Sequence, residues 1–147
     1  MAFVLIAVAL ALGALASIQP GVNGRMRTAL GDPIFAALVS TTFSTTSLLI
    51  YTLIRQPARP SFDKLAAGPW WMWTGGFIGA AYVALAIILT QKIGSAAMMA
   101  AIVVGQMVAA MVIDHFGVFG LEVREITPTR LLGVLLLFAG VALIRYF

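Results

Sequence analysis

The side chains most able to do chemistry in this sequence are uncharged hydrogen-bonding groups within long apolar segments. Gln19 and Asn23 lie four residues apart at the end of the first segment. Ser40 and Ser44 have the same spacing in the second segment, and Gln106 lies in the middle of the fourth. Amides and hydroxyls are costly to expose to lipid, so they should face one another, water or a bound solute. We predict that these five side chains line one cavity and bind a substrate.

The residues around Gln19 and Asn23 allow two interpretations. Pro20 has no backbone N–H, and it disfavours the helical conformation of the residue before it. A broken helix at membrane depth is tolerated where it lines a cavity. The segment is therefore either a polar binding element made by Gln19 and Asn23 or an ordinary helix end near the membrane surface.

The second apolar segment contains a run of hydroxyl side chains, with seven Ser or Thr residues among the eight from Ser40 to Ser47. Such hydroxyls can bond to the carbonyl one helical turn earlier and then cost little in lipid. Hydroxyls all round a helix exceed what one packing face needs. Because Ser40, Ser44 and Ser47 share one face at helical spacing, we favour a cavity-lining role over packing alone.

Small residues at four-residue spacing predict two helix-packing faces. Such residues let the backbones of neighbouring membrane helices approach closely. The two sets are Ala97, Ala101, Gly105 and Ala109 in the fourth apolar segment, and Gly75 and Gly79 in the third. Tyr82, on the face of the third segment that carries Trp71 and Gly75, is the aromatic candidate for the cavity wall.

Asp114 and His115 form the one carboxylate–imidazole pair, at the end of the fourth apolar segment. Such a pair could shuttle protons. At a segment end we favour a solvated cap or an interfacial salt bridge, with Arg124 as a candidate partner. The chain has one histidine and no cysteine, so we predict neither a metal site nor a cofactor, and no enzymatic activity.

The composition shows what kind of element positions these groups. Of 147 residues, 62% are hydrophobic and 10% are charged, against roughly 25% charged in an ordinary soluble domain. Too few polar side chains remain to cover a soluble surface, which excludes a cytosolic enzyme, a disordered chain and a nucleic-acid-binding protein. The sequence predicts an all-α integral membrane protein.

Windows free of charge predict five membrane-spanning helices, because about 20 apolar residues cross the hydrocarbon core. Together they form a single five-helix transmembrane domain over residues 1–147. Asp32-Pro33 and Thr127-Pro128 each place a capping side chain before a proline, as at the start of a helix. The first helix lacks the preceding Lys or Arg of a signal peptide, so we expect it to be retained. The spans are 2–20, 33–54, 69–91, 95–115 and 128–146.

The basic residues give no orientation signal, although Lys and Arg normally collect on the cytoplasmic side. Five lie on the side of the N-terminus and four on the other: Arg55, Arg59, Lys64, Arg124 and Arg130 against Arg25, Arg27, Lys92 and Arg145. A chain without bias can insert both ways and pair about a two-fold axis in the membrane plane. We predict an antiparallel dual-topology homodimer, or pairing with an oppositely oriented homologue, giving a ten-helix inverted-repeat bundle.

The pattern of residues resembles the YdcZ-type family of small bacterial inner-membrane proteins, a domain-of-unknown-function family in the drug/metabolite transporter superfamily. The resemblance covers almost the whole chain and implies a five-span half-transporter in the bacterial inner membrane. The Gly-Gln to Asp-His-Phe-Gly stretch is its most specific part. The matching motifs are Q-x3-N at Gln19 and Asn23, P-W-W-M-W-x-G-G-x-x-G from Pro69 to Gly79, G-Q-x7-D-H-F-G-x-F-G from Gly105 to Gly120, and R-x2-G at Arg130 and Gly133.

The leading hypothesis is half of a small-molecule transporter that works by alternating access as an antiparallel dimer. No charged residue lies in the middle of a span, which argues against a carboxylate-centred antiporter of cationic drugs. Neutral, anionic or amphipathic substrates remain. The alternatives are a small dual-topology ion channel and a lipid flippase or scramblase. We expect a small-molecule substrate, membrane lipids and a second chain as partners, and no nucleic acid.

Overall fold

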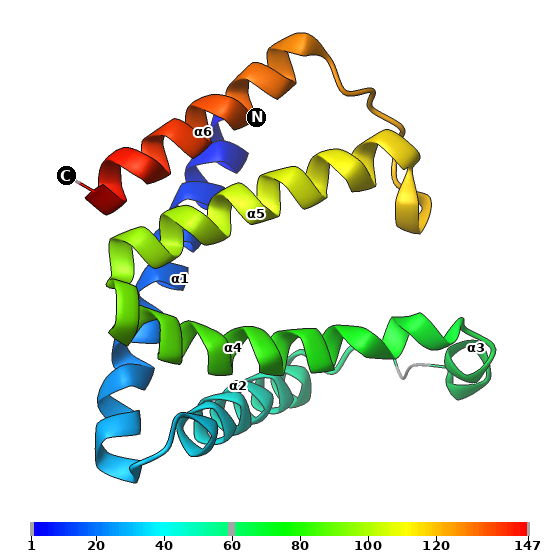
Figure 1. The fold of residues 1–147 in the computed structure, drawn as a ribbon. Helices are drawn as coiled ribbons and strands as arrows, with labels where there is room; N and C mark the ends of the chain where they lie inside the picture. The colour runs from blue at the N-terminus through cyan, green and yellow to red at the C-terminus, as the bar shows by residue number, and fades with distance from the viewer. Residues whose placement is uncertain (1, 59–60, 147) are drawn as a thin grey trace. The chain divides into compact units, whose positions relative to one another are not determined.

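The computed structural model describes residues 2–58 and 61–146, and over these residues it contains helices and no strand (Figure 1). Five helical stretches in this part of the chain are long and apolar enough to cross a membrane, as the sequence predicts. The elements are α1 (Ala2–Leu30), α2 (Pro33–Arg55), α3 (Phe62–Ala66), η1 (Trp70–Trp73), α4 (Thr74–Ile93), α5 (Ser95–Phe116), η2 (Val118–Gly120) and α6 (Pro128–Tyr146). They form two compact units, residues 1–91 and residues 92–147.

Helix α1 is longer than the predicted first span. It contains 29 residues and continues through Pro20, for a length of about 43 Å at 1.5 Å per residue. The apolar part of the segment ends near Ile18, whereas the helix ends only where Gly31 adopts a φ of +78° and its N–H bonds to the Arg27 carbonyl at 2.8 Å. Hydropathy marks the part of the helix that fits the hydrocarbon, and the backbone remains helical beyond it.

The predicted caps form at the starts of two spanning helices. One carboxylate oxygen of Asp32 accepts hydrogen bonds from the backbone N–H groups of Ile34 (2.7 Å) and Phe35 (3.2 Å). The hydroxyl of Thr127 accepts one from the N–H of Arg130 (3.3 Å). These contacts satisfy N–H groups that have no partner inside the helix.

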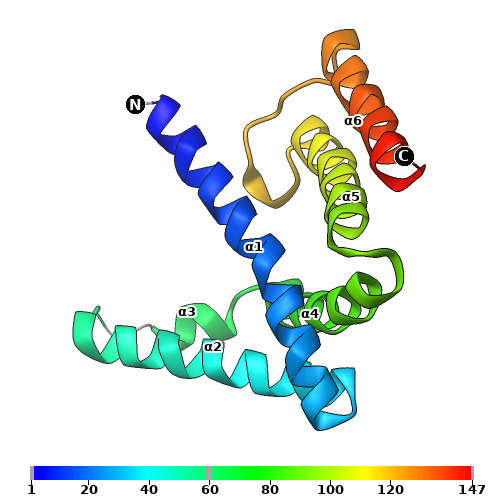
Figure 2. The same cartoon turned by 90° about the vertical axis from the view of Figure 1, so that its left-hand side faces the viewer.

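In the first unit, α1 and α2 meet near the turn that joins them and diverge away from it (Figure 2). The buried residues of α1 in this region, Pro20, Asn23 and Gly24, lie on one helical face. Helix α2 presents the buried Ala36 and Ala37. Gly and Ala have little side chain, so the two backbones can approach closely here.

The C-terminal half of α4 completes the core of the first unit. Ile87 is fully buried in a cluster with Ala36 and Ala37, and Val83 and Ala84 pack against this cluster. The part of α1 from residue 3 to residue 15 is exposed on all sides. In a membrane protein this apolar surface is available to lipid or to another chain.

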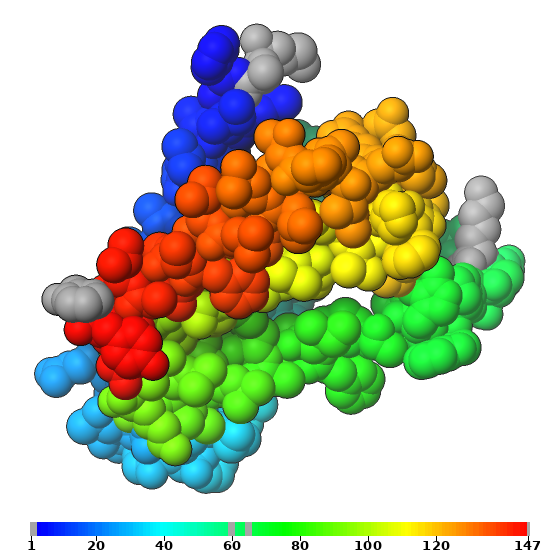
Figure 3. Space-filling view, turned by 45° about the horizontal axis from the view of Figure 1, so that its top comes forward, coloured from blue at the N-terminus to red at the C-terminus, as the bar shows by residue number. Residues whose placement is uncertain are grey.

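In the second unit, α6 lies along α5 (Figures 1 and 3). Buried residues of α5 recur every seven positions at Ala97, Val104 and Met111, as on one face of a helix, and Val134 is the buried residue of α6. Within this unit the packing face of α5 therefore contains one residue of the predicted small-residue stripe, Ala97, and otherwise consists of larger apolar side chains.

Candidate functional site

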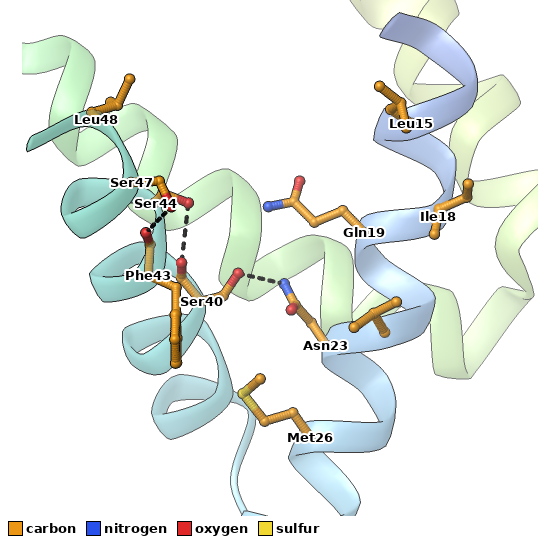
Figure 4. Close-up of a pocket in the computed structure, with 11 residues that line it drawn as sticks. Leu15, Ile18, Gln19, Asn23, Met26, Ser40, Phe43, Ser44, Ser47 and Leu48 are labelled. Atoms are coloured by element: carbon orange, nitrogen blue, oxygen red, sulfur yellow. Dashed lines mark hydrogen bonds between the residues drawn. The ribbon is translucent and has the colours of Figure 1, made fainter. Parts of the chain in front are cut away.

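An open groove of about 730 Å³ separates α1 from α2 where the two helices diverge (Figure 4). Its walls contain four of the predicted substrate-binding residues, Gln19 and Asn23 on α1 and Ser40 and Ser44 on α2. Ser47 extends the α2 wall by one turn. The remaining lining residues are apolar, so the groove contains no charged side chain. Its volume lies within the range of small-molecule sites.

Asn23 and Ser40 join the two walls at the closed end of the groove. The Asn23 side chain is 4% exposed, and its Nδ2 donates to the Ser40 hydroxyl oxygen at 3.1 Å. A buried amide in lipid needs a partner of this kind. The helix continues through Pro20 to Leu30, so the Gln19–Asn23 segment is not an ordinary helix end, and Pro20 does not break the helix. A binding role for Gln19 and Asn23 stays a prediction.

The serine hydroxyls farther along α2 bond to their own helix. The Ser44 hydroxyl donates to the Ser40 carbonyl at 3.0 Å, and the Ser47 hydroxyl donates to the Phe43 carbonyl at 2.8 Å. Thr45 and Thr46 make equivalent bonds outside the groove. The predicted back-bonding is thus confirmed, and it explains how so many hydroxyls fit one membrane helix.

A polar link that the sequence did not reveal joins α1 to α4 in the same unit. The guanidinium of Arg27 donates to the side-chain oxygen of Gln91, and the amide nitrogen of Gln91 donates to the Gly24 carbonyl at 3.3 Å. A Cβ atom at position 24 would lie 3.4 Å from that nitrogen, which is an ordinary van der Waals distance. The two side chains are 64 residues apart, and no local spacing connects them.

The structure does not place Tyr82 or Gln106 in the groove walls. Tyr82 is half-buried on α4, and Gln106 is exposed on α5 in the second unit. Neither lines the groove between α1 and α2. A cavity that includes Gln106 remains a prediction.

Most of the predicted packing residues make no use of their small size within their own units. Ala97 is buried, whereas Ala101, Gly105 and Ala109 are exposed. A Cβ atom built at Gly105, Gly75 or Gly79 would meet nothing within 4 Å outside its own helix. These faces are not used for packing within their own units, so the role of these residues in helix packing also stays a prediction.

Asp114 forms its salt bridge with Arg130, and not with Arg124 as the sequence suggested. Arg130 Nη2 lies 2.7 Å from Asp114 Oδ2, and about a third of each side chain is exposed. Arg124 pairs instead with Glu122 at 3.1 Å, while its backbone N–H donates to the Asp114 carbonyl at 2.9 Å. The loop carries the Arg124 side chain away from Asp114, and the first turn of α6 brings Arg130 back to it.

The Asp-His-Phe-Gly motif thus stabilises the loop between α5 and α6 through hydrogen bonds and a salt bridge. The Nδ1 atom of His115 accepts a hydrogen bond from the Ile126 N–H at 3.4 Å. Arg130 Nη1 donates to the carbonyls of Arg124 (3.1 Å) and Glu125 (3.3 Å). These contacts give Asp114 and His115 a structural role at this loop, and both an interface role and a proton-transfer role remain predictions.

The fold and the groove define a class of protein: a multi-pass helical membrane protein with an uncharged polar groove between its first two spans. A family model described as "putative inner membrane exporter, YdcZ" matches residues 4–143. The chain belongs to this family, as its motifs indicated. No curated protein and no solved structure matches it.

Proposed function

We propose that the chain is half of a small-molecule exporter, and that the groove between α1 and α2 is part of its substrate site. The observation that carries this proposal is that four polar residues from two helices line one uncharged groove: Gln19, Asn23, Ser40 and Ser44. The family, described as an inner-membrane exporter, supports the same class of function. Alternating access would expose this groove to each side of the membrane in turn.

A water-accessible groove can be tested by cysteine labelling, because the chain has no cysteine of its own. We expect a Ser47→Cys variant in membranes to react with a membrane-impermeant maleimide, since Ser47 lines the groove. Thr46→Cys, at the neighbouring position outside the groove wall, is the matched control and should react only after detergent is added. A Ser47→Cys variant that stays unlabelled in membranes would show that the groove faces lipid, and the proposed site would fail.

The dimer is the second part of the proposal. Five helices are few to enclose a substrate path, whereas two oppositely oriented copies would supply ten around an inverted repeat. The faces available for this contact include the exposed small residues of α4 and α5, among them Gly75, Gly79 and Gly105. An oppositely oriented homologue could replace the second copy.

Dual topology makes a direct prediction about reporter fusions. We expect reporters fused to the C-terminus to be active on both sides of the membrane, because the basic residues divide five to four. Three lysines added to one loop should lock a single orientation. A strong one-sided signal from the unmodified chain would contradict the homodimer and leave pairing with a second gene product.

A further inference from the structure

The groove between α1 and α2 offers more hydrogen-bond acceptors than donors on its α2 wall. The hydroxyl protons of Ser44 and Ser47 are engaged with backbone carbonyls of their own helix. A hydroxyl that donates its proton in this way keeps oxygen lone pairs and can only accept further bonds. The two serines therefore present acceptors to anything that lies in the groove (Figure 4).

The α1 wall adds amide groups, one of which is unengaged. Within the described part of the chain, the Gln19 side chain makes no hydrogen bond, and it points from α1 toward α2 (Figure 4). It supplies one acceptor and two donors. The oxygen of Asn23 is a further acceptor, because only its amide nitrogen is used by Ser40.

The hydrogen-bond donors and acceptors of the groove discriminate between classes of solute. An anion in the groove would have no positive side chain beside it, because no lining residue is basic, and the Ser44 and Ser47 hydroxyls would offer it only oxygen lone pairs. A cation in the groove would likewise lack a counter-charge, because no lining residue is acidic. Leu15, Ile18 and Phe43 give the groove its apolar surface.

We infer that the groove takes an uncharged amphiphile whose polar end carries N–H or O–H donors. This inference rests on the proposed function and narrows its substrate class, because it excludes anions. The donors of the solute would bond to Ser44 and Ser47, its acceptor would meet the Gln19 amide, and its apolar part would lie against Leu15 and Phe43.

Three probes with one apolar body separate these chemistries. They are 2-phenylacetamide, its N,N-dimethyl derivative, which has no donor, and phenylacetate, which is an anion. Binding to the full chain in lipid nanodiscs is measured by saturation-transfer NMR, with empty nanodiscs as the reference. We expect the primary amide to bind at least about fivefold more tightly than the dimethyl derivative, as the loss of one hydrogen bond implies, and phenylacetate to bind most weakly.

A double variant tests whether Ser44 and Ser47 cause the preference for the primary amide. Ser44→Ala with Ser47→Ala should abolish the preference for the primary amide while leaving the fold intact, because both hydroxyls bond only within α2. Thr45→Val with Thr46→Val is the matched control, because it removes equivalent back-bonded hydroxyls outside the groove. This control variant should keep the preference for the primary amide.

The inference is overturned if the dimethyl derivative or phenylacetate binds as tightly as the primary amide, if none of the three binds, or if the alanine variant keeps the preference. The labelling of Ser47→Cys distinguishes failure of the inferred substrate class from failure of the proposed function. A labelled groove that shows no preference overturns the substrate class alone, whereas an unlabelled groove overturns the site itself.

Discussion

Replacing Gly117 by alanine is expected to destabilise the α5–α6 unit by about 2–4 kcal/mol. Gly117 ends α5 with a φ of +58°, in the left-handed region that residues with a Cβ atom rarely adopt. A Cβ atom there would also lie 2.8 Å from Val123 Cγ2 and 3.1 Å from the Leu121 carbonyl oxygen. Backbone strain and crowding act together, so the loop after α5 must move.

The effect can be measured as the free energy of unfolding in mixed micelles with increasing SDS. Gly13→Ala is the matched control, because Gly13 lies within α1 and a Cβ atom there would meet nothing within 4 Å outside its own helix. Alanine is the better helix former, so this control should be neutral or slightly stabilising. Equal unfolding of the two variants would show that the loop does not adopt the conformation described.

Arg130→Gln should produce the second large effect, a loss of about 1–2 kcal/mol after solvent screening is allowed for. It removes the salt bridge to Asp114 and the hydrogen bonds to the Arg124 and Glu125 carbonyls. Arg130→Lys should be intermediate, because an ammonium group keeps the charge but lacks the planar fork that reaches several oxygens.

Arg124→Gln is the matched control for Arg130→Gln. The side chains of Arg124 and its partner Glu122 are 66% and 79% exposed, so their pair should contribute about 0.5 kcal/mol or less. Unfolding in SDS micelles at low and high salt measures both variants. If Arg124→Gln were as destabilising as Arg130→Gln, Asp114 would depend on Arg124 after all.

The sequence by itself determined the class of protein, the five spanning helices and the capped starts of α2 and α6. Hydropathy suffices for the spans, because a backbone in lipid must satisfy its hydrogen bonds internally and a helix does so within one segment. The cap of Asp32 needs only residues two and three positions away. The back-bonds of Ser44 and Ser47 likewise depend on the residue one turn earlier.

Only the tertiary structure decided which polar groups meet. It placed Asn23 against Ser40, Arg27 against Gln91, and Arg130 against Asp114. A periodic pattern shows which face of a helix is polar. It does not show which helix lies opposite or how far a loop carries a side chain. Those depend on where the small residues Ala36 and Ala37 let the helices pack and on the path of the loop between α5 and α6.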